Sequence, residues 1–326
     1  MRLLMGITDH SFVETVTPSE PPLAIAAMRE LAASHETYKV ALKTFVDELI
    51  VNKCILERGY QGELFSRILL TLARDRATVF NDKEEVPTIS ARTFLTTLLG
   101  QNLGLPHDDY RLKDQFLKEM GTMHINFTHI FQLKQDIDDL TFDFLCEAWR
   151  RGAAFQCKFQ QPCIDGFIVT YRGKLDGPFE KDKFSYIAWQ SKMRVDAATA
   201  DVPSELTGPR VEGKKPSSTV VLFMDLGTKS HFVSKAGPLC QLSFEPAQHP
   251  TKARERRWRG YMPTQEEEPH RWCINTRGHT SDTYPEIKDV SEHFATLFNR
   301  SSSWTVPALS RFAELMEDRM NPFHIP

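Results

Sequence analysis

The segments EAWRRGAAFQCKFQQPCIDGFIVTYRG at 147–173 and DKFSYIAWQSK at 182–192 decide which fold this sequence is expected to adopt. The first segment closes a helix, because apolar residues recur every three or four positions over 136–151 and the pattern stops at Gly152. The sequence then changes to strand character, with aromatic and β-branched residues between turn residues such as Pro162. The strands that we predict here are 153–159, 164–171 and 184–192.

The flanking sequence adds strands on the C-terminal side and helices on both sides. An apolar run predicts a buried strand at 219–225, and two further strand candidates follow at 239–244 and 271–276. Residues 196–218 are polar and rich in Pro, Gly and Ser, which is typical of a long loop. The helices expected from apolar periodicity are 23–33, 38–57, 63–77, 91–99, 109–120, 285–298 and 306–319.

The order of these elements predicts an α+β protein in which helices flank a mixed sheet. We expect two parts, a helical N-terminal region over 1–120 and a sheet-containing domain over 121–326. Residues 1–22, which end in a Pro-rich stretch, are expected to form a loose leader. Gly59 and Gly62 are expected to separate two of the N-terminal helices, because glycine disfavours a helix interior.

The composition is that of an ordinary globular protein, with 41% hydrophobic and 25% charged residues in a chain of 326. A net charge of −3 gives no global attraction to a polyanion, so nucleic-acid binding would need local basic patches. None of the six cysteines forms a CxxC pair, which favours free thiols and an intracellular location, in the nucleus or cytoplasm. Apolar runs are too short for a membrane span, so no membrane partner is expected.

Two carboxylates in the deciding segments are candidates for a functional site. Glu147 lies three and seven residues after Phe144 and Leu140, so it is expected on or beside the helix face that packs inward. Asp165 heads an apolar strand and alternates onto the same face as Phe167. A carboxylate in such a position needs a partner, because an unpaired buried charge is costly.

Gln190 and Lys192 complete the candidate site. They are two residues apart on the third predicted strand, so both are expected to point to one face. Hard divalent cations such as Mg²⁺ bind oxygen ligands, polarise a phosphoryl oxygen and lower the pKa of bound water. A nearby lysine can stabilise developing negative charge, or help to orient and deprotonate the attacking water.

The order of helix glutamate, strand aspartate and Gln-x-Lys strand resembles the PD-(D/E)XK (restriction-endonuclease-like) nuclease superfamily. The resemblance covers about 136–300, with motif-specific residues only in 147–192, and implies a central four-stranded mixed sheet with flanking helices. It matches four residues to the motif: Glu147 as the helix acid, Asp165 as the strand acid, Gln190 as the acid or glutamine of the third strand, and Lys192 as its lysine. The motif's proline-acid doublet is absent, because Ile164 precedes the strand acid.

Two further stretches narrow the resemblance. RGAAFQCKFQQPCID at 151–165, followed by WQSK at 189–192, is similar to the nuclease-like domains of fungal Crinkler-type and RHS-type proteins. RGYQGELFSRILLTLARD at 58–75 resembles the segment that links such a domain to an NTPase-like region. The resemblance therefore implies an upstream NTPase region in relatives, whereas this chain, which lacks a convincing P-loop, is not expected to be an NTPase.

The first functional hypothesis is a metal-dependent nuclease that hydrolyses phosphodiester bonds of nucleic acid, expected to be DNA, with Mg²⁺ or Mn²⁺ as the cofactor. Glu147, Asp165 and Gln190 are expected to bind the metal, and Lys192 to act on the water or the transition state. Substrate contacts are expected from Gln156, Lys158, Gln160, Arg256 and Arg257.

The second hypothesis is a catalytically degenerate nuclease fold that acts as a nucleic-acid-binding or protein-binding effector module. It rests on Gln190, which stands where the motif more commonly has an acid. A neutral amide oxygen binds Mg²⁺ more weakly than a carboxylate does.

Overall fold

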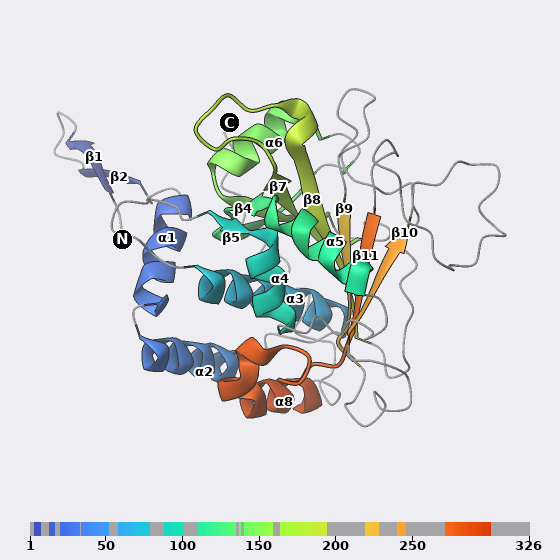
Figure 1. Cartoon of the computed structure of the whole chain (residues 1–326). Coiled ribbons are helices and arrows are strands. Elements are labelled where there is room, and N and C mark those ends of the chain that lie inside the picture. Colours follow the sequence, from blue (N-terminus) through green and yellow to red (C-terminus); the bar gives the residue numbers. More distant parts are fainter. Residues whose placement is uncertain are drawn as a thin grey trace.

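The structure is a computed structural model, and Figure 1 shows a curled sheet with helices packed around it. It describes residues 3–7, 13–16, 20–32, 34–51, 58–78, 88–100, 110–134, 137, 140–158, 164–193, 219–227, 240–245 and 271–300. In that part of the chain, no helix combines the length and apolarity that crossing a bilayer requires.

The main sheet contains nine described strands, seven of which lie side by side in the order β10-β11-β9-β8-β7-β4-β3. β6 pairs with β7, and β5 pairs with β6. β9 is parallel to both β8 and β11, whereas β7 is antiparallel to β6 and β8. The predicted mixed sheet is therefore confirmed, but a four-stranded sheet is wrong, because further strands extend it on both sides.

The strands differ in length, and the long ones lie at the centre. The strands of the main sheet are β3 (Ile89–Ser90), β4 (His124–Ile125), β5 (His129–Gln132), β6 (Ala153–Gln156), β7 (Gly166–Tyr171), β8 (Phe184–Lys192), β9 (Thr219–Asp225), β10 (Cys240–Glu245) and β11 (Arg271–Arg277). A separate antiparallel hairpin joins β1 (Leu3–Ile7) and β2 (Val13–Val16). The segments 147–173 and 182–192 supply β6, β7 and β8, which are neighbours in the sheet.

Helices cover both faces of the sheet. The α-helices are α1 (Glu20–Ala32), α2 (His35–Val51), α3 (Arg58–Ala77), α4 (Ala91–Leu99), α5 (Tyr110–Gly121), α6 (Phe142–Arg150) and α8 (Ser291–Arg300). The described part of the chain also contains the 3₁₀-helices η2 (Lys181–Lys183) and η3 (Pro285–Val290). Because both faces are covered, the central strands read as nearly continuous apolar runs, and every residue of β7 is buried.

Two apolar clusters separate the two faces. On one face, Ile168, Trp189 and Leu222 pack with residues of α3, α4 and α5. On the other, Phe167 and Tyr186 pack with residues of α6. The first cluster runs without a break from the N-terminal helices into the sheet, so residues before 120 supply one of the layers that cover it.

The ends of α6 follow from local chemistry. Thr141 begins the helix, because its hydroxyl oxygen accepts a hydrogen bond from the Phe144 N–H at 3.2 Å. Gly152 follows its last turn with a φ of +60°, and a Cβ there would come within 2.9 Å of the Asn126 carbonyl oxygen. Only glycine fits both conditions, so the predicted stop at Gly152 is confirmed.

Several sequence-based expectations agree with the structure, and two do not. Helix α4, strand β8 and strand β9 have the predicted bounds. The expected loose leader is wrong, because 1–22 contains β1 and β2 and the start of α1. The expected break at Gly59 and Gly62 is also wrong, because α3 runs through both. The expected loop at 196–218 and helix at 306–319 lie outside the described residues.

Candidate functional site

Asp165 lies immediately before β7, where β6, β7 and β8 meet. Its backbone N–H donates to the Trp189 carbonyl at 2.8 Å, and its carbonyl accepts from the Cys157 N–H at 2.8 Å. These bonds fix the residue between the two neighbouring strands. β7 and β8 pack tightly at this point, because a Cβ on Gly166 would meet the Trp189 ring at 2.2 Å. The position of Asp165 is therefore set by the backbone of the sheet.

The Asp165 carboxylate is held by the end of β8. The Ser191 hydroxyl and the Ser191 N–H both donate to Asp165 Oδ2, each at 2.6 Å. Ser191 alternates onto the face of β8 that carries Trp189, which is the face covered by α3. The strand acid thus lies beside the strand that was expected to complete the site.

Helix α3 brings a second carboxylate, Glu63, to the same place. The helix comes very close to β8, because a Cβ on Gly62 would lie 3.0 Å from Met193 Cγ and 3.6 Å from Ser191 Oγ. Glu63 follows this glycine on α3 and accepts a hydrogen bond from Gln156 Nε2 on β6. Gln156 is buried, and its Oε1 has no hydrogen-bond partner among the described residues.

The two carboxylates interact electrostatically. Burial raises the pKa of Glu63 above its ordinary value, and the charge of Asp165 raises it further. Burial likewise raises the pKa of Asp165, while the hydrogen bonds from Ser191 and the charge of Lys192 oppose that rise. Two partly buried acids that repel each other form a position where a cation is favoured.

Lys192 ends β8 beside these acids. Its charge lowers the pKa of both Glu63 and Asp165, although burial outweighs it in each case. Its carbonyl accepts the Leu226 N–H at 2.8 Å, which fixes the strand end against the turn after β9. The structure therefore brings Lys192 and Asp165 into one electrostatic group, as the Gln-x-Lys pattern led us to expect.

Gln190, which was expected to face the site, lies on the side of β8 opposite to Ser191. It is buried in the centre of the sheet, opposite Phe223 of β9. Strand alternation places it on the face of Tyr186 and Ala188, opposite to that of Ser191. Lys192 shares this alternation, but it is the last residue of β8, and its long side chain acts on both acids from there.

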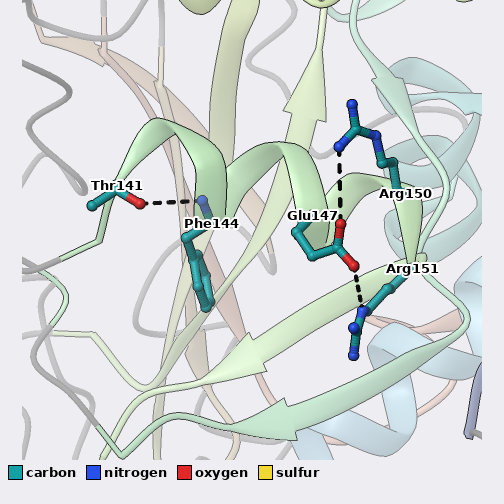
Figure 2. A network of polar contacts seen from close by, with 5 residues as sticks. All are labelled: Thr141, Phe144, Glu147, Arg150 and Arg151. Carbon is teal, nitrogen blue, oxygen red and sulfur yellow. Dashed lines mark hydrogen bonds and ion pairs between the residues drawn. The ribbon is translucent and has the colours of Figure 1, made fainter.

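Glu147, the expected helix acid, lies outside this group. It is on α6, which packs on the sheet face opposite to α3. Figure 2 shows its carboxylate between two arginines, with Arg151 Nε at 2.7 Å and Arg150 Nη1 at 3.9 Å. Half of the side chain is exposed to solvent, at 50%. Glu63, and not Glu147, is the helix glutamate that interacts with Asp165.

The expected substrate contacts are described only in part. Gln156 lies in the group through its hydrogen bond to Glu63. Lys158 follows β6 and is half-buried. Gln160, Arg256 and Arg257 lie outside the described residues.

The sequence contains a signal for Glu63 outside the segments that resemble the PD-(D/E)XK motif. The residue lies inside RGYQGELFSRILLTLARD, which was matched to a linking segment and not to a site. Its neighbour Gly62 sits in a helix, where glycine is unfavourable unless a close approach requires it. Nothing in the sequence pointed to Ser191 as a partner of Asp165.

Comparison with protein-family models, with curated proteins and with solved structures finds no match to this chain. Within the described ranges, no three or more His, Cys, Asp or Glu side chains gather so that they could hold a metal ion. The group around Asp165 has two acids, and its other polar groups are one amide (Gln156), one hydroxyl (Ser191) and one ammonium (Lys192). Such an oxygen-rich set suits Mg²⁺ or Mn²⁺, because Mg²⁺ is commonly bound by one or two carboxylates and keeps several waters.

Proposed function

We propose that this protein is a metal-dependent nuclease that hydrolyses phosphodiester bonds of nucleic acid, with DNA as the substrate to test first. The observation that carries the proposal is geometric. Ser191 of β8 donates two hydrogen bonds to Asp165, and Glu63 follows Gly62, where a Cβ would lie 3.6 Å from the same serine hydroxyl, beside the strand that Lys192 ends. The arrangement of the neighbouring strands supports it, because β6–β9 form a consecutive mixed block of the kind that the PD-(D/E)XK resemblance implies.

The residues present fit a hard divalent cation. Glu63 and Asp165 would hold it, because their mutual repulsion is relieved by a bound positive charge. The unpartnered Oε1 of Gln156 is a further buried oxygen beside Glu63. Glu63 and Asp165 would hold Mg²⁺ or Mn²⁺ where the ion would supply Lewis-acid polarisation of a phosphoryl oxygen and a lowered pKa of water.

The chain's own residues have separate roles in this proposal. Lys192 supplies a positive charge at the end of β8, where it would stabilise the negative charge that develops on the phosphate. Asp165 stays oriented, because Ser191 and the neighbouring strands fix both its side chain and its backbone. Glu63 is ionised more readily once a cation is present, because burial and Asp165 otherwise keep its pKa raised.

The test compares Asp165→Ala and Lys192→Ala with the parent chain on linear and supercoiled DNA with Mg²⁺. We expect both variants to lose DNA cleavage by at least about 100-fold, as for removal of a group that stabilises transition-state charge. Glu147→Ala, purified in the same way, controls for contaminating nuclease and should cut like the parent. Equal cleavage by all four preparations would show that the activity is not that of this site.

A catalytically degenerate fold that binds nucleic acid or protein is the second candidate. Two observations favour it: Gln190 stands where an acid is commoner, and no larger metal-type cluster lies in the described part of the chain. It predicts that Mn²⁺ does not bind at Asp165 and that DNA affinity survives Asp165→Asn. Titration calorimetry with Mn²⁺ therefore separates the two candidates before any cleavage assay is attempted.

A further inference from the structure

One carboxylate oxygen of Asp165 receives two hydrogen bonds from a single residue. The Ser191 hydroxyl and the Ser191 N–H both donate to Oδ2, each at 2.6 Å. A carboxylate oxygen that already accepts two short bonds is satisfied and fixed in direction. Neither bond occupies Oδ1, so the geometry distinguishes the two oxygens of the acid.

Ser191 is well placed to impose this orientation. Only 8% of it is exposed, and it lies under α3, where a Cβ on Gly62 would approach its hydroxyl oxygen to 3.6 Å. Its backbone position is fixed by pairing with Met224 of β9. A buried side chain on a central strand has little freedom to rotate, so the hydroxyl keeps its direction.

Glu63 is held in a similar way by a different residue. Gln156 Nε2 donates a hydrogen bond to Glu63 Oε2. Gln156 is also buried, with 7% exposed, and lies on a strand next to β7. Each acid of the group therefore has one oxygen tied by a neutral side chain from the sheet.

We propose that Ser191 is a positioning residue, which ties Asp165 Oδ2 so that Oδ1 is presented to a divalent cation. The inference rests on the proposed function, because it assumes that Asp165 is a metal ligand. Groups that orient metal ligands usually change metal affinity or activity about 10- to 100-fold when they are removed. The Ser191 N–H remains in every side-chain variant, so a change of about 10-fold is expected.

The experiment measures Mn²⁺ binding to the full chain by titration calorimetry from pH 5.5 to 8.5. Ser191→Ala removes the hydroxyl, and Ser191→Cys replaces it with a much weaker donor of similar volume. Ser191→Thr keeps the hydroxyl and is the conservative rescue. Ser185→Ala is the matched control, because Ser185 is also buried and lies on the same strand and face, near its other end.

We expect Ser191→Ala and Ser191→Cys to bind Mn²⁺ about 10-fold more weakly, and Ser191→Thr and Ser185→Ala to stay within about 3-fold of the parent. As pH increases, the Mn²⁺ affinity of Ser191→Ala and Ser191→Cys should also begin to increase at a higher pH than the affinity of the parent does. The reason is that the lost hydrogen bond favoured the ionised acid, and metal ligands must be deprotonated.

The outcomes separate this inference from the proposed function. If Asp165→Asn abolishes Mn²⁺ binding but Ser191→Ala and Ser191→Cys bind like the parent, the positioning role is wrong and the metal site stands. Equal weakening by Ser185→Ala would also overturn the positioning role, because it would show a general packing effect. If Asp165→Asn leaves Mn²⁺ binding unchanged, the metal site itself is wrong. Should Ser191→Ala fail to fold, Ser191→Cys decides alone.

Discussion

Helices α3 and α6 each carry a glutamate toward the same central strands, yet only one of these acids lies beside Asp165. Glu63 on α3 is partly buried, and the charge of Asp165 raises its pKa. Glu147 on α6 is half exposed and paired with Arg150 and Arg151 (Figure 2). The acids thus have opposite surroundings, one beside another acid and the other between two cations.

The difference lies in how closely each helix approaches the sheet. At Gly62, α3 comes so close to β8 that even a Cβ would crowd Met193. On α6, buried residues such as Trp149 fill the space between the helix and β7, and Glu147 points past them to solvent. Glu63 lies beside Asp165 because the backbone of α3 comes close to β8 at this point.

The largest expected effect separates the two glutamates directly. Glu63→Gln keeps the size of the side chain but removes its charge, so Mn²⁺ affinity should fall by more than the roughly 10-fold expected for an outer residue. Glu147→Gln should leave Mn²⁺ affinity within about 2-fold of the parent, because its partners are surface arginines. Titration calorimetry on both variants at pH 7.5 measures the difference. If Glu147→Gln has the larger effect, the site has been assigned to the wrong helix.

The second effect tests the close approach of α3. Gly62→Val should displace the helix from β8, because a side chain there meets Met193 and Ser191. Overpacking of this kind costs about 1–3 kcal/mol of unfolding free energy, and Mn²⁺ binding should weaken with it. Gly121→Val at the end of α5 is the matched control, because a Cβ there meets nothing within 4 Å. Denaturant unfolding and Mn²⁺ titration of both variants give the two readouts.

Much of the fold followed from local patterns. β8 and β9 could be predicted because strands covered on both faces carry nearly continuous apolar runs. Gly152 could be predicted as a helix stop because its φ of +60° suits glycine. These features depend on a few neighbouring residues, so the sequence contains the information in one place.

Only part of the candidate site could be predicted from the sequence, and the reason is physical. Asp165 directly precedes β7 and Lys192 ends the neighbouring antiparallel strand β8, so the order of the predicted strands was enough to place both residues at the same end of adjacent strands. Glu63 comes from a helix that precedes Asp165 by about a hundred residues in the chain, and its position depends on how α3 packs. Glu147 had a suitable helical period, but periodicity identifies the face of a helix that packs inward and not how close a side chain on it comes to the sheet.

The third expected effect is on the pH dependence of stability, and it concerns buried acids near the C-terminal end of α3, at the opposite end from Glu63. Beyond its C-terminal end, Glu286 of η3 is only 2% exposed, and neither carboxylate oxygen has a hydrogen-bond partner among the described residues. Burial raises its pKa to about 9, and burial likewise raises the pKa of Asp75 to about 7. The folded chain therefore binds protons more tightly than the unfolded chain does at these two acids.

These two acids should make stability fall as pH rises through about pH 7 to 9, above the range in which the partly buried histidines titrate, because the unfolded chain has already released these protons. Glu286→Gln should flatten the upper part of this curve and be more stable than the parent at pH 9 by at least about 1 kcal/mol. Urea unfolding at several pH values measures it. Adding Mn²⁺ should reduce the pH dependence of stability that comes from Glu63 and Asp165, but it should leave the part that comes from Glu286. A free energy of unfolding that increases toward pH 9 without Mn²⁺ would contradict the buried-acid explanation.

The smallest effect concerns the ion pairs of Glu147. Glu147 and Arg151 lie four residues apart, with about half of each side chain exposed, at 50% and 53%. Exposed pairs with this spacing contribute only about 0.3–0.5 kcal/mol. A double-mutant cycle of Glu147→Ala and Arg151→Ala should give a coupling free energy in that range, and salt should reduce it further. A coupling above about 2 kcal/mol would mean that Glu147 is far less solvated than its exposure indicates. A small value instead places Glu147 among ordinary surface acids, as the exposure of its side chain indicates.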